Sequence, residues 1–273
     1  MGSYLVTDKK KITAQTFRSM KAKGEKISML TSYDFTLAGI VDEAGIDGIL
    51  VGDSASNVMQ GNETTLPITV DEMIVYAKGV KRAAKRALVV CDMPFGSYQA
   101  STERAMANGI KIMKETGVDA LKLEGGREIV AAVKALVAAG IPVMGHLGLT
   151  PQSIHRFGGY GLRAKDDDEA RRLVEDAQML CQAGCFAIVL EKIPALLAKK
   201  VTKAVQCPTI GIGAGNGTDG QILVVHDMLG MSAGFKPKFL RKYADTRSII
   251  SNAIGQYVAD VKAGEFPNDE ESY

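Results

Sequence analysis

Ionisable side chains stand at the ends of several short apolar runs in this chain. One polar residue after an apolar run is commonplace, but six of eight such runs end in this way. If those ends converge in space, like charges repel one another unless a cation or a charged substrate offsets them. The pattern therefore indicates one shared site, built from Asp53-Ser54, Asp92, Lys122 and Glu124, His146, Glu191 and His226-Asp227.

Three carboxylates of this set suit a hard divalent cation. Asp53, Asp92 and Glu124 end three consecutive apolar runs. Carboxylate oxygens, completed by water and substrate oxygens, form the octahedron that Mg2+ prefers. Zn2+ is disfavoured, because His146 is the one plausible nitrogen donor near these runs. The sequence therefore predicts a magnesium site.

Lys122 has two interpretations that the sequence leaves open. It lies two residues before Glu124, so both side chains point to the same side of a strand and into a barrel. A lysine beside a metal carboxylate can neutralise a second anion, such as a substrate carboxylate or an enolate. The alternative is a plain salt bridge to Glu124.

Glu191 follows the apolar run at 186–190, two strands beyond Glu124. We interpret it as a general base held off the metal. The alternative is an ordinary carboxylate at the rim of the fold. His146 is the next candidate for the base, because histidine titrates near neutrality.

The elements that must position these residues alternate along the chain. Near-continuous apolar runs are typical of parallel strands covered on both faces; they span 27–31, 47–52, 87–91, 119–123, 141–145, 186–190, 208–213 and 222–226. Helical patterns separate them at 34–45, 70–86, 103–117, 127–139, 167–184, 194–205 and 246–262. This alternation predicts a single (β/α)8 TIM barrel domain over 1–273, with an extra N-terminal helix near 13–23 and its chemistry at the C-terminal strand ends. A doubly wound open sheet is the alternative fold.

Two connections and one glycine run add to this prediction. The connections 53–69 and 147–165 are long enough to suggest function, and the glycine-rich second one is predicted to close over the site. The run 211–220 contains G-x-G-x-x-G spacing at Gly215, Gly217 and Gly220. In a dinucleotide site this spacing follows the strand that opens the fold, and an acidic residue lies about 20 residues further on. Neither condition holds here, so close packing at the barrel rim is the better interpretation.

The composition excludes some functions and favours a compartment. Lys and Arg number 33 and Asp and Glu number 31, a net charge of +2, which argues against nucleic acid and anionic membranes as partners. The apolar runs are too short to span a bilayer, and the N-terminus has no apolar signal stretch. The four cysteines, at 91, 181, 185 and 207, are expected to be small buried apolar side chains. These features favour a cytoplasmic protein.

Longer motifs carry a resemblance to a known family. They are TSYD (31–34), VGDS (51–54), TLPITVDEM (65–73), CDMPFGSY (91–98), LKLEGG (121–126), PVMGHLGLTPQS (142–153), VLEKIP (189–194) and IGIGAGNGTDGQILVVHDMLG (210–230). In this order, over nearly the whole chain, they resemble the ketopantoate hydroxymethyltransferase family. The resemblance implies a barrel of the phosphoenolpyruvate and isocitrate lyase type. It also implies hydroxymethyl transfer from 5,10-methylenetetrahydrofolate to 3-methyl-2-oxobutanoate, giving ketopantoate through an enolate that Mg2+ stabilises.

The resemblance assigns roles to residues already chosen from the strand ends. It implies that Asp53, Asp92 and Glu124 bind Mg2+, that Asp53, Ser54, Asp92 and Lys122 contact the oxo acid, and that Glu191 accepts the proton. It further implies a homodecamer. The chain departs from the family pattern at Asn62-Glu63-Thr64 and at Tyr76, which leaves the folate contacts unassigned.

One alternative function shares most of these features. Another magnesium–enolate barrel enzyme, a C–C lyase or a phosphonate mutase, would have a similar metal site but would not use folate. Release of tetrahydrofolate therefore distinguishes the two activities.

Overall fold

A computed structural model describes residues 10–234 and 236–273 of the chain. They form two compact units, one reaching Val224 and the other Val225–Tyr273. The candidate site lies entirely in the first unit. The expectation of one domain over 1–273 stays a prediction.

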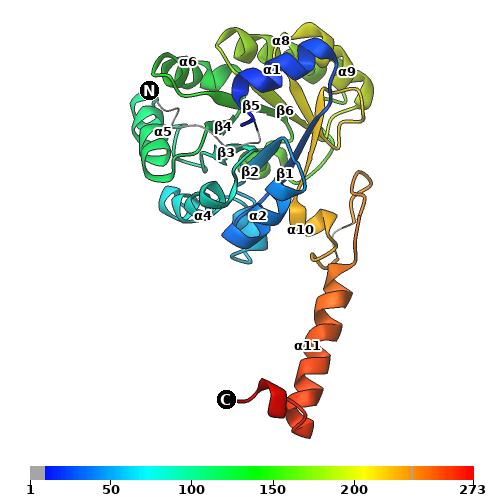
Figure 1. The fold of residues 1–273 in the computed structure, drawn as a ribbon. Coiled ribbons are helices and arrows are strands. Elements are labelled where there is room, and N and C mark those ends of the chain that lie inside the picture. The colour runs from blue at the N-terminus through cyan, green and yellow to red at the C-terminus, as the bar shows by residue number, and fades with distance from the viewer. Residues whose placement is uncertain (1–9, 235) are drawn as a thin grey trace. The chain divides into compact units, whose positions relative to one another are not determined.

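The first unit is a closed barrel of eight parallel strands in sequence order, as Figure 1 shows. The strands are β1 (Ile27–Thr31), β2 (Gly48–Val51), β3 (Leu88–Asp92), β4 (Ala120–Glu124), β5 (Val143–Gly148), β6 (Ala187–Glu191), β7 (Thr209–Ile212) and β8 (Gly220–Leu223). Closure comes from β1 pairing with β8, where Ile27 lies opposite Gly220. The predicted barrel is confirmed, and the open-sheet alternative is wrong.

Helices cover the barrel between its strands, and most begin at a side-chain cap. They are α1 (Ala14–Lys23), α2 (Phe35–Glu43), α3 (Ala55–Val58), α4 (Val70–Ala83), α5 (Thr102–Thr116), α6 (Val130–Ala138), α7 (Ile154–Phe157), α8 (Asp167–Gln182) and α9 (Ala195–Ala204). At the start of α4, the Thr69 side chain accepts from the Glu72 backbone, and Glu72 accepts from Thr69. This reciprocal cap satisfies two backbone N–H groups that a helix start leaves unpaired. The extra N-terminal helix is confirmed as α1.

Two strands are displaced from their predicted bounds by two to three residues: β5 lies later than the expected 141–145, and β8 lies earlier than expected. We expected 222–226, but β8 begins at Gly220 and ends at Leu223. A Cβ on Gly220 would lie 2.5 Å from the Ile27 carbonyl oxygen, so glycine permits a close approach that hydrophobic patterning does not detect. His226-Asp227 consequently lie in α10 (Val225–Met228) of the second unit, and their predicted place at a strand end is wrong.

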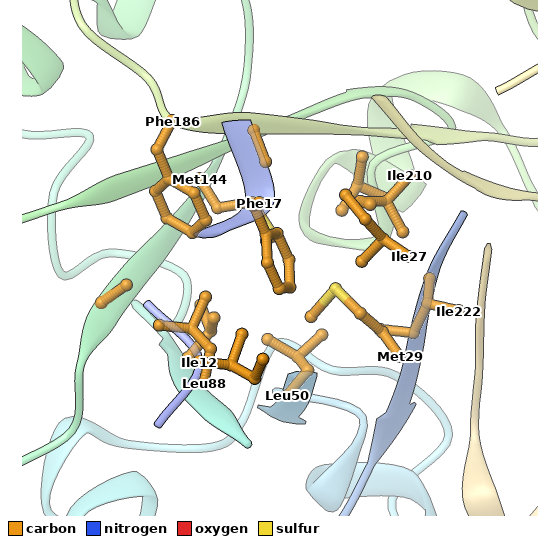
Figure 2. Close-up of a cluster of buried hydrophobic side chains, with 14 residues drawn as sticks. Ile12, Phe17, Ile27, Met29, Leu50, Leu88, Met144, Phe186, Ile210 and Ile222 are labelled. Carbon is orange, nitrogen blue, oxygen red and sulfur yellow. The ribbon is translucent and has the colours of Figure 1, made fainter. Parts of the chain in front are cut away.

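Phe17 of α1 closes the N-terminal end of the barrel. Its ring is fully buried among Ile27, Met29, Leu88 and other core side chains, as Figure 2 shows. It meets the Phe186 ring edge to face, with centroids 5.9 Å apart, a preferred aromatic geometry. Because apolar side chains fill this end, polar chemistry is confined to the opposite, C-terminal end of the strands.

The second unit is largely helical. It contains α10, α11 (Thr246–Ala263) and the short turn η3 (Asp269–Glu271). Every residue of α11 is exposed or partly exposed. Across the described part of the chain, the helices lack the combination of length and apolarity that crossing a bilayer requires.

Candidate active site

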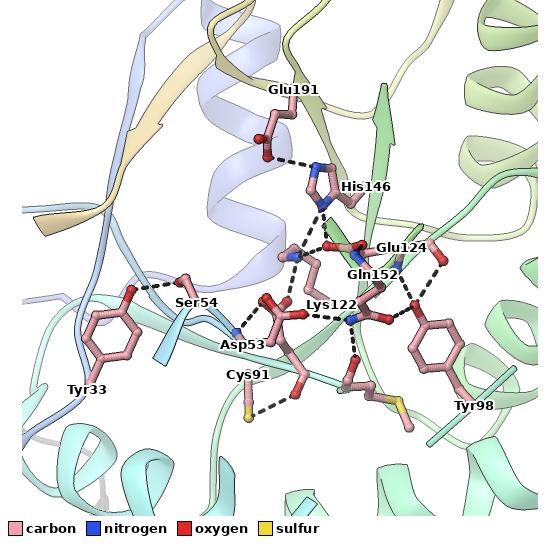
Figure 3. Close-up of polar contacts among 12 residues, drawn as sticks. Tyr33, Asp53, Ser54, Cys91, Tyr98, Lys122, Glu124, His146, Gln152 and Glu191 are labelled. Atoms are coloured by element: carbon pink, nitrogen blue, oxygen red, sulfur yellow. Dashed lines mark hydrogen bonds and ion pairs between the residues drawn. The ribbon is translucent and has the colours of Figure 1, made fainter. Parts of the chain in front are cut away.

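The structure gathers the predicted side chains at the C-terminal ends of five consecutive strands. Asp53 and Ser54 follow β2, Asp92 ends β3, Lys122 and Glu124 lie in β4, His146 lies in β5, and Glu191 ends β6. Figure 3 shows most of them pointing toward one another. Asp53, Asp92, Lys122, Glu124 and His146 are each at most 5% exposed. The barrel topology therefore produces the convergence expected from the sequence, without His226-Asp227.

Lys122 is the cationic centre of this cluster. Its Nζ lies 2.6 Å from Oδ1 of Asp92 and 3.8 Å from Oε1 of Glu124. Burial lowers the pKa of Lys122, but the charges of Asp92, Glu124 and Asp53 outweigh burial and raise it above its ordinary value. The ammonium is therefore charged at neutral pH. Its shortest ion pair is to Asp92. The salt bridge to Glu124, which was the alternative interpretation from the sequence, is therefore only one of its two ion pairs.

Asp53 and Asp92 lie close together, and both side chains are buried. The Asp53 backbone N–H donates to Oδ2 of Asp92 over 3.0 Å. Burial, together with the charges of Asp92 and Glu124, raises the pKa of Asp53 well above its usual range. Burial also raises the pKa of Asp92. Both shifts indicate that these carboxylates need more positive charge than Lys122 provides.

Glycine at position 52 permits this close arrangement. A Cβ there would lie 2.7 Å from Oγ of Ser54 and 3.5 Å from Oδ2 of Asp92. Ser54 Oγ in turn shares a 2.7 Å hydrogen bond with the hydroxyl of Tyr33. Sequence reasoning missed Tyr33, although it lies in the TSYD motif.

His146 connects the buried cluster to Glu191. Its Nδ1 lies 3.1 Å from Oε1 of Glu124, and its Nε2 lies 3.4 Å from Oε2 of Glu191. Burial and the Lys122 charge lower the pKa of His146, but Glu124 and Glu191 raise it further, to about 9. The imidazole is therefore a cation at neutral pH that bridges two carboxylates. The Glu191 side chain is 17% exposed, which makes it more accessible than the other site carboxylates.

Gln152 and Tyr98 were missed by sequence reasoning, and they brace the carboxylates. The Gln152 backbone N–H donates to Oε2 of Glu124 over 2.9 Å, and its Nε2 donates to Oδ2 of Asp53 over 2.9 Å. Its Oε1 accepts from the Tyr98 hydroxyl over 2.7 Å. Both residues lie in motifs that carry the family resemblance, which is the signal that could have found them.

The donor set fits a divalent cation. Four carboxylates, of Asp53, Asp92, Glu124 and Glu191, face two cationic side chains, Lys122 and His146. The surplus of negative charge on oxygen donors suits Mg2+. As the side chains stand in residues 10–234 and 236–273, no group of three or more His, Cys, Asp or Glu residues is arranged to hold a metal ion. In this arrangement, Gln152 donates a hydrogen bond to Oδ2 of Asp53, and Lys122 forms an ion pair with Oδ1 of Asp92.

The long connection after β5 is anchored beside the site. The Arg163 backbone N–H donates to the Lys192 carbonyl over 2.9 Å, and the Lys192 ammonium donates to the Tyr160 carbonyl. Burial is the main cause of a raised pKa at Tyr160, and the charges of Asp53 and Glu191 raise that pKa further. The connection therefore lies within electrostatic reach of the site, as a lid requires.

The glycine run after β7 is a packing feature. A Cβ on Gly215 would lie 2.5 Å from Cβ of Ala195, and one on Gly217 would lie 3.0 Å from Cβ of Lys199. Both contacts are with α9. These glycines let the loop pack closely on that helix, as the rim interpretation requires.

Comparisons with known proteins agree on one family. A family model described as ketopantoate hydroxymethyltransferase matches residues 11–269. The 3-methyl-2-oxobutanoate hydroxymethyltransferase of Phocaeicola vulgatus is 61% identical over 273 residues, which is all of both chains. The enzyme of the same name from Flavobacterium johnsoniae is 60% identical over 266 residues, covering 97% of this chain and 98% of its own.

Solved structures share the fold at low sequence identity. A phosphonopyruvate hydrolase in complex with oxalate and Mg2+ has a TM-score of 0.62 at 11% identity, over 95% of this chain and 93% of its own. A 2,3-dimethylmalate lyase, a member of the PEP mutase/isocitrate lyase superfamily, has a TM-score of 0.57 at 17% identity, over 92% and 98%. The expected barrel type is therefore confirmed.

Proposed function

Because this chain belongs to the ketopantoate hydroxymethyltransferase family, enzymes of pantothenate biosynthesis, we propose that it transfers a hydroxymethyl group from 5,10-methylenetetrahydrofolate to 3-methyl-2-oxobutanoate. The observation that carries this proposal is the buried cluster of Asp53, Asp92 and Glu124 around Lys122. Such a cluster stabilises a cation and, through it, a substrate that gains negative charge during reaction.

Asp53, Asp92 and Glu124 would hold Mg2+. When bound, Mg2+ supplies Lewis-acid stabilisation of the negative charge that develops on an oxo acid as it enolises. Gln152 positions two of these carboxylates through its hydrogen bonds to Asp53 and Glu124. Tyr98 holds Gln152 in turn, so the ligand set is oriented before substrate arrives.

Lys122 and Ser54 would bind the oxo acid. The Lys122 ammonium, charged because three carboxylates surround it, attracts the substrate carboxylate. The Ser54 hydroxyl, fixed by its hydrogen bond to Tyr33, offers a directed polar contact on the opposite side of Asp53. Together they orient the substrate so that its C3 faces the β6 end of the site.

Glu191 would take the C3 proton onto a carboxylate oxygen. It ends β6 and is the most accessible carboxylate of the set, at 17% side-chain exposure. His146 fixes its direction through the 3.4 Å contact with Oε2. One water adds to the methylene carbon carried by folate, both carbon–nitrogen bonds to that carbon break, and formaldehyde and tetrahydrofolate result. The substrate enolate carbon then attacks the formaldehyde carbon, and the new alkoxide takes the proton back from Glu191 to give the hydroxymethyl group.

The proposed assembly is a homodecamer. The family resemblance implies ten copies, and α11 supports contact between copies. Its apolar residues Ile250, Ile254, Tyr257, Val258 and Val261 are 41–57% exposed and follow the helical spacing i, i+4, i+7, i+8 and i+11. An exposed apolar stripe of this kind is typical of a helix that packs on a partner.

The decisive experiment measures turnover and co-substrate together. We expect Mg2+-dependent consumption of 3-methyl-2-oxobutanoate with stoichiometric release of tetrahydrofolate, followed by absorbance. Consumption of the oxo acid without any dependence on 5,10-methylenetetrahydrofolate would instead identify a lyase or mutase. Full turnover after chelation of divalent metal would refute the metal assignment.

A further inference from the structure

Three of the four cysteines lie at the end of the barrel opposite the candidate active site. Cys181 lies in the last turn of α8, while Cys185 and Cys207 each lie two residues before the first residue of β6 and β7, respectively. Cys185 and Cys207 are fully buried, but Cys181 is partly exposed. The expectation that all four are plain buried side chains is therefore wrong for Cys181. The proposed reaction uses none of these three thiols.

The surroundings of Cys181 favour a negative charge on its sulfur. The Cys207 backbone N–H donates to Sγ of Cys181 over 3.2 Å. The Arg18 guanidinium lies alongside, with its Nη2 3.4 Å from the Cys185 carbonyl oxygen. These donors outweigh the unfavourable dipole at the end of α8.

The three thiols consequently differ in pKa. The neighbouring Cys207 side chain contributes most to lowering the pKa of Cys181. Together with the backbone donors and Arg18, it outweighs the effect of burial and brings the pKa of Cys181 to about 6. The neighbouring Cys181 side chain and burial raise the pKa of Cys207 above its ordinary value. Burial raises the pKa of Cys185 to about 12. One partly exposed thiol with a lowered pKa therefore lies beside one buried thiol with a raised pKa, which is the arrangement of a redox-reactive pair.

We propose that Cys181 and Cys207 form a peroxide-responsive pair that oxidises to an intramolecular disulfide. The Cys181 thiolate attacks hydrogen peroxide; an S–O bond forms, the O–O bond breaks, and hydroxide leaves. The sulfur is oxidised to a sulfenic acid and the peroxide oxygen is reduced. The Cys207 thiol then loses its proton and attacks the Cys181 sulfur; the S–S bond forms, the S–O bond breaks, and the departing hydroxide takes that proton to give water. In sum, two thiols and one peroxide give one disulfide and two waters.

The geometry selects Cys207 as the resolving thiol. Its backbone N–H already donates to the Cys181 sulfur over 3.2 Å. Cys185 interacts with Cys181 through charge, and its backbone N–H donates to the Leu180 carbonyl over 3.1 Å. Cys91 lies in β3 beside Asp92, at the other end of the barrel.

The test treats the reduced full-length protein with one equivalent of hydrogen peroxide at neutral pH, blocks remaining thiols with N-ethylmaleimide, and maps the peptides by mass spectrometry. We expect loss of two hydrogen atoms and a single cross-linked peptide joining Cys181 to Cys207. Cys207→Ser should stop at a sulfenic acid on Cys181, which dimedone traps. Cys185→Ser is the matched control from the same cluster and should still form the disulfide.

A second measurement does not depend on any cysteine variant folding. Iodoacetamide should alkylate Cys181 first in the wild-type protein, with a rate whose pH midpoint lies near the pKa of about 6. Arg18→Gln should move that midpoint upward. A disulfide between Cys181 and Cys185, equal oxidation of all four cysteines, or an alkylation midpoint no lower than that of a free cysteine would each overturn the proposal.

Discussion

At the scale of single residues, the site is a balance between buried carboxylates and few cations. Lys122 is held between Asp92 and Glu124, and His146 between Glu124 and Glu191. Removing one carboxylate therefore changes the charge seen by every other member of the cluster. Substitutions that keep shape but change charge are the informative ones.

The magnesium set makes a prediction about binding. Asp53→Asn, Asp92→Asn and Glu124→Gln should each weaken Mg2+ and oxo-acid binding together, because the three carboxylates form one buried donor set. We expect a loss of roughly 10-fold or more in each affinity, as for removal of a charged buried partner. Calorimetric titration of Mg2+ and of 3-methyl-2-oxobutanoate measures both. Unchanged affinities in all three variants would show that the metal binds elsewhere.

Glu191 makes a prediction about proton transfer. Glu191→Gln keeps the shape of the side chain but removes its proton affinity, so Mg2+ and oxo-acid binding should survive. Exchange of the C3 proton of 3-methyl-2-oxobutanoate into deuterated water, followed by NMR without folate, should fall by roughly 10²–10⁴-fold, the usual contribution of a general base. Exchange at the wild-type rate would show that a group other than Glu191 takes the proton.

The sequence predicted these residues because strand ends have a readable signature. Asp53, Asp92, Glu124 and Glu191 each close an apolar run, and parallel strands bring such ends together. Gln152 has no such signature: it lies in a 3-10 turn and reaches Asp53, 99 positions away, through a side-chain amide. Contacts of this kind depend on loop conformation, which local patterning does not encode.

At the scale of elements, the connection 147–165 is the segment expected to respond to substrate. Through Arg163 and Tyr160 it contacts Lys192, the residue after Glu191. Binding that reorganises the end of β6 should therefore slow hydrogen exchange across this connection. Exchange measured by mass spectrometry, with and without oxo acid and Mg2+, tests this. Identical protection in both states would remove the lid interpretation, and α5 provides an internal reference.

Asp42 joins α2 to the start of β3 and makes a prediction about stability. Its carboxylate accepts from the backbone N–H groups of Lys85, Arg86 and Ala87 over 2.7–3.1 Å. Burial opposes the charge, but these hydrogen bonds outweigh it and lower the pKa of Asp42. Asp42→Asn should lower the free energy of unfolding by about 1–3 kcal/mol at neutral pH. The substitution replaces one accepting oxygen by an NH2 group, which cannot accept a hydrogen bond from the backbone N–H groups that it faces.

The sign of the pH dependence follows from the lowered pKa. The Asp42 carboxylate contributes its full stabilisation above the pKa of an unfolded aspartate, about 3.9, and loses it as pH falls through the lower pKa of the folded state. Urea unfolding of wild type and Asp42→Asn between neutral and acid pH should show the difference shrinking at the acid end. Glu43→Gln, the exposed neighbour, is the control and should differ little from wild type at any pH.

The elements also show where sequence patterning reaches its limit. All eight strands lie within three residues of their predicted bounds, since buried parallel strands have long apolar signals. The eighth was placed late, because Gly220 begins β8 where its backbone meets Ile27. A glycine selected for close approach has no side chain for patterning to detect.

At the scale of the whole molecule, the proposed homodecamer makes the last prediction. Ten chains of 29.1 kDa give a particle of about 290 kDa, which sedimentation velocity resolves from a monomer or a dimer. If the exposed apolar stripe of α11 is covered by another copy, Ile254→Glu should place a charge in that contact and shift the protein to smaller species. Asn252→Glu adds the same charge to a polar position of the same helix and should leave the assembly intact. A wild-type chain that sediments as a monomer, or equal behaviour of the two variants, would show that α11 does not hold copies together.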